Sequence, residues 1–149
     1  MIRNEQEYKE AAEKLRAESA RLEDHRKHLA ESGLTAEQVD RAMEPLISFH
    51  LQLREEVEHY ENLKRGQFPD LQNLQGLGVL LVSLRIARGI SQRDLAKELG
   101  VHESQVSRDE RNEYHGITLD RAIKVLNALG VRLETRVVSA PLAKEEQTA

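Results

Sequence analysis

Two short helical patterns separated by a single glycine are the feature that most restricts the fold of this chain. The first runs from Ser91 to Leu99, with Ser91 suited to the N-cap position and Gly100 suited to end the helix. The second runs from His102 to Asn112. Because glycine adopts the left-handed backbone of a tight turn at little cost, the two helices are expected to cross steeply at Gly100.

Apolar residues give these two helices a common buried side. Leu95, Ala96 and Leu99 share one face of the first helix, and Ala96 is small where a second helix must approach closely. Val101 and Val106 supply the buried face of the second helix. What remains exposed on the second helix is polar.

This exposed face suits DNA bases. Its side chains are Glu103, Ser104, Gln105 and Arg108. Hydrogen-bonding groups of this length reach base edges when a helix lies in the major groove. The alternative for the same residues is an ordinary solvated helix face, and for Arg108 taken alone that alternative is stronger.

The segment resembles the Cro/repressor (XRE) helix-turn-helix family through the pattern S-Q-x-x-L-A-x-x-L-G-V-x-x-S-x-V-S-R-x-E, which runs from Ser91 to Glu110. The resemblance extends over residues 74–129. It implies that Gln92 grips a DNA phosphate and that Ser91 can do likewise. It implies base contacts for Glu103, Ser104, Gln105 and Arg108, and an internal bridge between Arg85 and Glu110. Arg93, Lys97 and Arg111 are further candidates for phosphate contacts.

Two positions depart from the family pattern. Asp109 stands where the family more often has a large apolar or aromatic residue, and Arg111-Asn112 replaces a frequent glycine. The loop that follows, residues 112–116, is therefore expected to differ in shape. For Tyr114 and His115 in this loop, two interpretations have equal weight: a contact with a DNA phosphate, or exposure to solvent without a specific role.

The first 66 residues predict a long helical hairpin. A narrow apolar seam in a charged background predicts a helix over residues 4–31. Thr35 and Gln38 form a capping-box pattern that starts a second helix, in which Pro45 predicts a kink or a break. Such narrow seams bury little on their own, so the hairpin is expected to serve oligomerisation or partner binding.

The predicted fold is all-α, with this hairpin, a helix-turn-helix bundle and one short C-terminal β-strand. The expected bundle helices cover residues 73–88, 91–99, 102–112 and 118–129. The expected parts are a hairpin over 1–66, a linker over 67–72, the DNA-binding domain over 73–130, a strand over 131–138 and a flexible tail over 139–149. The strand is predicted by apolar and polar alternation, and it has no partner strand in the chain.

Charge and composition narrow the function further. Residues 1–70 hold eleven Lys/Arg and sixteen Asp/Glu, a net charge of −5, whereas residues 71–138 hold ten and eight, a net charge of +2. We therefore expect the acidic N-terminal part not to face phosphates. The chain has no cysteine, no signal peptide at its start and no long apolar stretch, so we expect a soluble cytoplasmic protein without membrane contact. His25 and His28 lie one turn apart without a suitably spaced third ligand, so no metal is expected, and neither a cofactor nor an enzymatic site is indicated.

These observations predict a regulator of transcription that acts as a repressor. We expect it to bind double-stranded DNA at a near-palindromic operator as a homodimer. The opening from Ile2 to Tyr8, followed by an acidic helix, resembles the start of HigA-type antitoxins and implies a possible toxin partner and repression of its own promoter. The alternative is a protein-binding adaptor or antitoxin whose acidic hairpin sequesters a basic partner protein.

Overall fold

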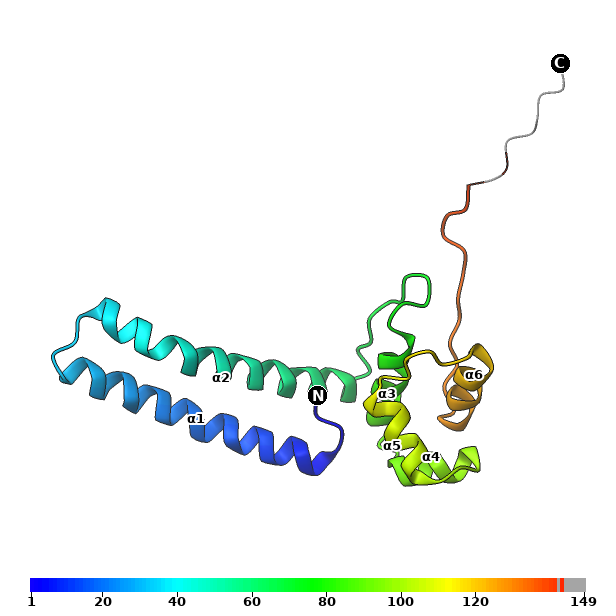
Figure 1. The fold of residues 1–149 in the computed structure, drawn as a ribbon, viewed down its shortest axis with the longest axis horizontal. Coiled ribbons are helices and arrows are strands. Elements are labelled where there is room, and N and C mark those ends of the chain that lie inside the picture. Colours follow the sequence, from blue (N-terminus) through cyan, green and yellow to red (C-terminus); the bar gives the residue numbers. More distant parts are fainter. Residues whose placement is uncertain (142, 144–149) are drawn as a thin grey trace, which may run out of the picture.

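A computed structural model describes residues 1–141 and 143 of the chain, and these residues form helices and loops but no strand. The helices are α1 (Glu5–Glu31), α2 (Ala36–Lys64), α3 (Leu77–Ala87), α4 (Gln92–Leu99), α5 (Glu103–Arg111) and α6 (Leu119–Ala128). Figure 1 shows α1 and α2 as a long antiparallel hairpin, with the four short helices gathered at one end of it. The architecture is all-α, as predicted.

Side-chain caps start both long helices. The side chain of Asn4 accepts a hydrogen bond from the backbone of Glu7, and Thr35 and Gln38 form the expected capping box. The helix does not break at Pro45, since α2 continues through this residue as one element. Proline removes only one backbone hydrogen bond here, and buried residues on both sides of it, Met43 and Val57, hold α2 in place.

The two long helices meet along a narrow seam. The rings of Tyr8 and Tyr60 stack with their centroids 4.8 Å apart, and each hydroxyl donates to a carboxylate of the other helix, Tyr8 to Glu61 at 2.8 Å and Tyr60 to Glu5 at 3.1 Å. No residue of α1 is buried. Neither long helix, nor any other among the described residues, is apolar enough over a sufficient length to cross a membrane.

One apolar core joins the hairpin to the short helices. Ile2, which precedes α1, and Val57, Tyr60 and Leu63 of α2 belong to the same buried cluster as the interior of the bundle. The bundle contributes Leu80, Leu81, Val82, Leu84, Ile86, Leu95, Ala96, Val106, Tyr114, Ala122, Val125 and Leu129. Because α2 packs on α3, the near end of the hairpin is fixed to the bundle.

The third helix begins later than expected. The prediction placed its start near Asn73, but α3 starts at Leu77. Asn73 and Leu74 have positive φ angles of 51° and 63°, and Gly76 follows with 81°. This left-handed backbone cannot continue into an α-helix, so the segment forms a turn ahead of α3.

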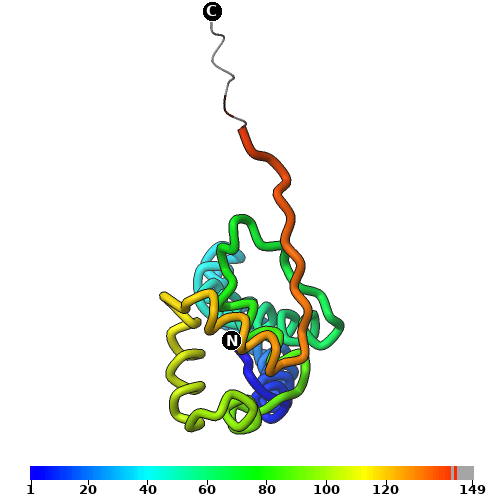
Figure 2. The backbone as a smooth tube through the Cα atoms, turned by 90° about the vertical axis from the view of Figure 1, so that its right-hand side faces the viewer, coloured from blue at the N-terminus to red at the C-terminus, as the bar shows by residue number. Residues whose placement is uncertain are grey.

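The predicted β-strand over residues 131–138 is wrong for the chain on its own. The segment has no secondary structure and runs beside the loop of residues 68–74 (Figure 2). A strand is held by ladder hydrogen bonds to a neighbour, and the described part of this chain supplies no such neighbour. Of the flexible tail predicted for 139–149, residues 142 and 144–149 lie outside the described residues.

A close approach between α3 and the loop after α5 requires a glycine. A Cβ atom at Gly78 would lie 1.9 Å from the backbone oxygen of Glu113 and 3.2 Å from the Cβ of Tyr114. Any side chain at this position must push the loop away from α3.

The substitution Gly78→Ala is therefore expected to lower the free energy of unfolding by about 1–3 kcal/mol, the usual cost of overpacking. Val79→Ala, at the next and more exposed position of α3, is the matched control and is expected to change it by less than about 0.5 kcal/mol. Urea unfolding of both variants measures the difference. Equal stability of the two variants would contradict the close approach.

All three tyrosines of the chain have a raised phenol pKa, and their titration is a second test of the fold. Burial, together with the hydrogen bond to Glu5, raises the pKa of Tyr60 to about 12 from its ordinary value of 10.0. The hydrogen bond to Glu61 raises the pKa of Tyr8, and burial raises that of Tyr114.

Because the folded state holds the phenol proton of Tyr60 more tightly, its contribution to stability is complete below pH 10.0 and is lost as the pH rises to about 12. We expect the native protein to form less tyrosinate at pH 10.0 than the urea-unfolded chain, which is half ionised there. The ultraviolet absorption of tyrosinate measures the ionised fraction in the native and in the urea-unfolded protein. Identical titration curves for the two would contradict the burial and hydrogen bonding described for the tyrosines.

Candidate nucleic-acid interface

Helices α4 and α5 form the expected pair around a glycine turn. Ser91 caps α4 by accepting a hydrogen bond from the backbone of Asp94, and Gly100 ends α4 in the left-handed conformation with φ 66°. His102 then caps α5 by accepting from the backbone of Ser104. Each cap satisfies a backbone group that the helix itself leaves without a partner.

The two helices are held together by their buried apolar faces. Leu95, Ala96 and Val106 are fully or almost fully buried, and α4 contacts both α5 and α6. The four short helices therefore present α5 at the edge of the bundle with one side buried and one side free.

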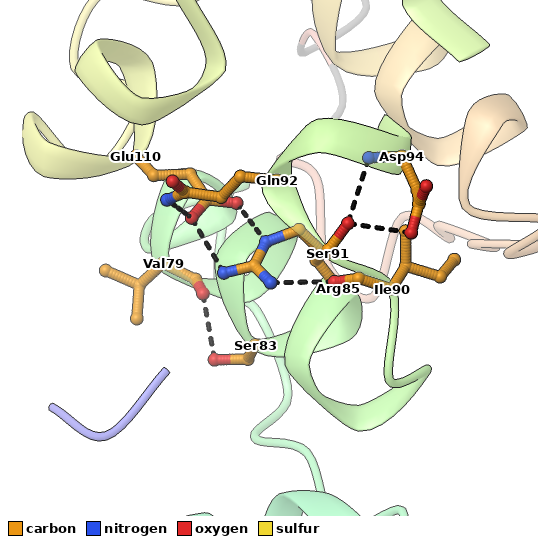
Figure 3. A network of polar contacts seen from close by, with 8 residues as sticks. All are labelled: Val79, Ser83, Arg85, Ile90, Ser91, Gln92, Asp94 and Glu110. Carbon is orange, nitrogen blue, oxygen red and sulfur yellow. Dashed lines mark hydrogen bonds and ion pairs between the residues drawn. The ribbon is translucent and has the colours of Figure 1, made fainter. Parts of the chain in front are cut away.

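A buried ion pair fixes α5 against α3. The guanidinium of Arg85 donates through Nε to Oε1 of Glu110 and through Nη2 to Oε2 at 2.9 Å. Arg85 is 4% and Glu110 1% exposed, so both charges are removed from water. Arg85 also donates through Nη1 to the backbone oxygen of Ile90 at 2.8 Å, which attaches the loop before α4 to the same group (Figure 3).

Gln92 belongs to this buried network. Its Nε2 donates to Oε2 of Glu110 at 2.7 Å, and the side chain is half-buried (Figure 3). The resemblance to the repressor family implied a phosphate contact for Gln92. In this structure its amide donor is directed inward, to the carboxylate of Glu110. The hydroxyl of Ser91 is similarly engaged, because it bonds the backbone and the carboxylate of Asp94.

The free side of α5 brings together most of the side chains predicted to contact DNA. Ser104, Gln105, Arg108 and Arg111 are exposed, and so is Glu103 in the first turn. The hydroxyl of Ser104 lies 2.8 Å from Nδ1 of His102. Gln105 and Arg108, in contrast, make no side-chain hydrogen bond to any described residue. On α4, Arg93 and Lys97 are also exposed.

The unusual residue Asp109 has a partner on the neighbouring helix. Its carboxylate lies 3.4 Å from the guanidinium of Arg121 on α6, and both side chains are partly buried. A polar pair thus occupies the place where the related family more often has an apolar contact. The departure from the family pattern is compensated within the fold.

The loop after α5 contains a buried residue that the sequence did not identify. Tyr114 was expected to be exposed or near a phosphate, but it is only 5% exposed and is part of the core, with its hydroxyl lacking a hydrogen-bond partner among the described residues. Glu113 and Tyr114 both have φ 51°, which turns the ring inward. The available signal was Gly78, an interior helix glycine that marks a close approach. His115 beside it is exposed.

The arrangement defines a helix-turn-helix domain, a class of fold that presents its second helix to DNA. A family model described as helix-turn-helix matches residues 81–135, and the chain accordingly contains a domain of the Cro/C1 (XRE) type there. No curated protein and no solved structure matches the chain. Within the described residues, no three acidic or histidine side chains gather closely enough to hold a metal ion.

The buried pair is open to a direct test. Glu110→Ala is expected to reduce the free energy of unfolding by about 3–5 kcal/mol, because it leaves the charge of Arg85 buried without its partner. Arg41→Ala is the control, since it removes an ion pair with Glu37 whose side chains are 76% and 78% exposed. The control is expected to cost less than about 0.5 kcal/mol. Denaturant unfolding followed by circular dichroism measures both, and a similar loss in the two variants would show that the buried pair does not organise the domain.

Proposed function

We propose that the protein is a sequence-specific DNA-binding regulator that represses transcription by occupying an operator. The observation that carries this proposal is the free face of α5. Its exposed Gln105 and Arg108 have no bonding partner among the described residues, and they stand on the second helix of a helix-turn-helix domain. Exposed polar side chains without internal partners are available to bond base edges.

The chemistry of each side chain suggests its role. Arg108 has the planar donor pair that suits guanine, and Gln105 has the donor and acceptor that suit adenine. Glu103 suits the amino group of cytosine and disfavours other bases. Ser104 can still reach a base edge, although its hydroxyl lies 2.8 Å from Nδ1 of His102.

Exposed cationic side chains would position the domain by bonding the DNA backbone. Arg93 and Lys97 on α4 and Arg111 at the end of α5 are free to bond phosphates. The inward-directed amide of Gln92 supports a role for this residue that differs from the phosphate contact implied by the related family. Gln92 holds Glu110, and thereby α5, while the arginines make the phosphate contacts.

A homodimer follows from the way such domains recognise DNA. A single α5 contacts only a few base pairs, so two copies related by a twofold axis would bind half-sites about one helical turn apart, about 34–36 Å. The operator is therefore expected to be a near-palindrome. The hairpin, with exposed Leu46, Phe49 and Leu51 near the middle of α2, is available to other contacts.

A second candidate is the antitoxin or adaptor role, in which the hairpin binds a basic protein. It is favoured by the net charge of −5 over residues 1–70 and by the exposed apolar residues of α2. This role adds a protein partner to the DNA-binding domain, or replaces DNA as the principal partner.

Selection of bound DNA from a random-sequence library at about 0.15 M salt tests the regulator proposal. We expect enrichment of a near-palindromic site. Arg108→Ala is then expected to lose discrimination between that site and a scrambled one by about 1–3 kcal/mol. Arg21→Ala, which changes an exposed arginine of α1, is the control and should keep the discrimination of the unaltered protein.

The contrary result is equally informative. If the folded protein enriches no sequence, the regulator proposal fails, and the adaptor role becomes the leading one. Recovery of a small basic protein in equal amount, with the hairpin as bait in the full-length chain, is then the expected outcome. If Arg108→Ala keeps full discrimination, Arg108 does not contact a base.

A further inference from the structure

The segment that follows α6 has the composition of a strand but no partner strand among the described residues. Residues 131–138 are extended and carry no secondary structure, and Leu133, Val137 and Val138 are 38%, 82% and 85% exposed. Extended backbone with exposed β-branched side chains offers unpaired hydrogen-bonding groups along its length. Such a segment is completed when another strand pairs with it.

The other strand is best supplied by a second copy of the same segment. A twofold axis that relates two neighbouring antiparallel strands is perpendicular to the sheet, so one residue lies opposite its own copy at the axis. The choice of that residue decides every other pair. Opposite charges placed across from each other stabilise a strand pair by about 0.2–1 kcal/mol, and like charges destabilise it.

Among the described residues, only one register is long and also places opposite charges across from each other. With Thr135 at the axis, Glu134 faces Arg136 of the other copy, Leu133 faces Val137, and Arg132 faces Val138. Each charge pair occurs twice, once on each side of the axis. The same register places Val131 opposite Ser139, so nine residues of each copy take part.

The neighbouring registers are worse for reasons visible in the sequence. With Glu134 at the axis, Glu134 faces its own copy and Arg132 faces Arg136. With Leu133 at the axis, Arg132 faces Glu134, but pairing beyond Val131 runs into the end of α6 at Ala128 and Leu129. With Arg136 at the axis, two arginines meet.

The surroundings of the segment also favour a second strand. One edge of it borders a hollow whose opposite wall includes Phe68 and Leu74, which are 37% and 43% exposed. A second segment lying in that hollow covers these side chains together with Leu133. The ion pair that Glu134 makes with Arg132 in the single chain is exposed at both ends, so exchanging it for Arg136 of a second copy costs little.

We propose that residues 131–139 form an antiparallel two-stranded ribbon with a second copy of the chain, centred on Thr135. This deepens the proposed function, on whose dimer it rests, because it identifies the partner and the element that joins the two copies. It assigns Glu134 and Arg136 as the residues that set the register.

Cysteine cross-linking tests the register directly, because the full-length chain contains no cysteine of its own. Residues directly opposite in an antiparallel pair have Cβ atoms about 4.5–5.5 Å apart, close to what a disulfide needs, whereas diagonal neighbours are about 7–8 Å apart. Thr135→Cys is therefore expected to form a covalent dimer rapidly under mild oxidation. Leu133→Cys and Glu134→Cys are the register controls, and Lys124→Cys on the exposed surface of α6 measures random collision.

Charge exchange provides an independent measurement. Arg136→Glu places two glutamates opposite each other on both sides of the axis, and we expect the dimer dissociation constant to rise roughly tenfold. Glu134→Arg should act similarly. The double variant Glu134→Arg, Arg136→Glu restores opposite charges and is expected to restore the dissociation constant, which analytical ultracentrifugation measures.

Each other outcome overturns the proposal. Faster cross-linking at Leu133→Cys or Glu134→Cys than at Thr135→Cys rejects the register. A monomeric protein, or a dimer whose Thr135→Cys variant cross-links no faster than Lys124→Cys, rejects the ribbon. The result is separate from the DNA result, because cross-linking is measured without DNA. Enrichment of an operator without cross-linking leaves the regulator proposal intact, and cross-linking without enrichment leaves the ribbon intact.

Discussion

The buried ion pair between Arg85 and Glu110 is the contact on which the DNA-binding part of the structure depends. It joins α3 to α5, and its remaining hydrogen bonds attach Ile90 and Gln92 at the start of α4. Removing two charges from water is costly, so this arrangement is tolerated only where every donor and acceptor is bonded. The packing of α3, α4 and α5 seen here supplies these bonds to Arg85 and Glu110. The ion pair thus specifies the orientation of α5 more than it stabilises the fold.

The hairpin is fixed to this domain at one end only. Ile2, Val57 and Leu63 share the core of the bundle, whereas the far end is held by contacts between α1 and α2 alone, such as the pair of Arg26 with Asp40 at 3.1 Å. At about 1.5 Å per residue, α1 extends roughly 40 Å from its start. Anything bound at the far end is therefore held well away from α5, and the hairpin can serve a second interaction without covering the face proposed to contact DNA.

The sequence predicted what short-range chemistry decides. Thr35 and Ser91 are caps because their side chains bond backbone groups three residues away, and Gly100 ends α4 because its backbone is left-handed. Other features depend on contacts between distant parts of the chain. The inward side chain of Gln92 and the burial of Tyr114 follow from Glu110 and Gly78, which a local pattern does not reveal. The strand predicted over residues 131–138 does not form, because the described residues supply no neighbouring strand.

The pair of Asp109 and Arg121 gives this domain an unusual relation to its solvent. Two partly buried charges 3.4 Å apart join α5 to α6. Mobile ions screen such a pair incompletely, yet they also displace a protein from DNA phosphates. Ionic strength therefore affects two contacts of α5. It weakens the ion pair with α6, and it weakens the proposed binding of α5 to DNA. If α5 contacts DNA as proposed, a rise in ionic strength releases the protein more sharply than its count of phosphate contacts alone would give.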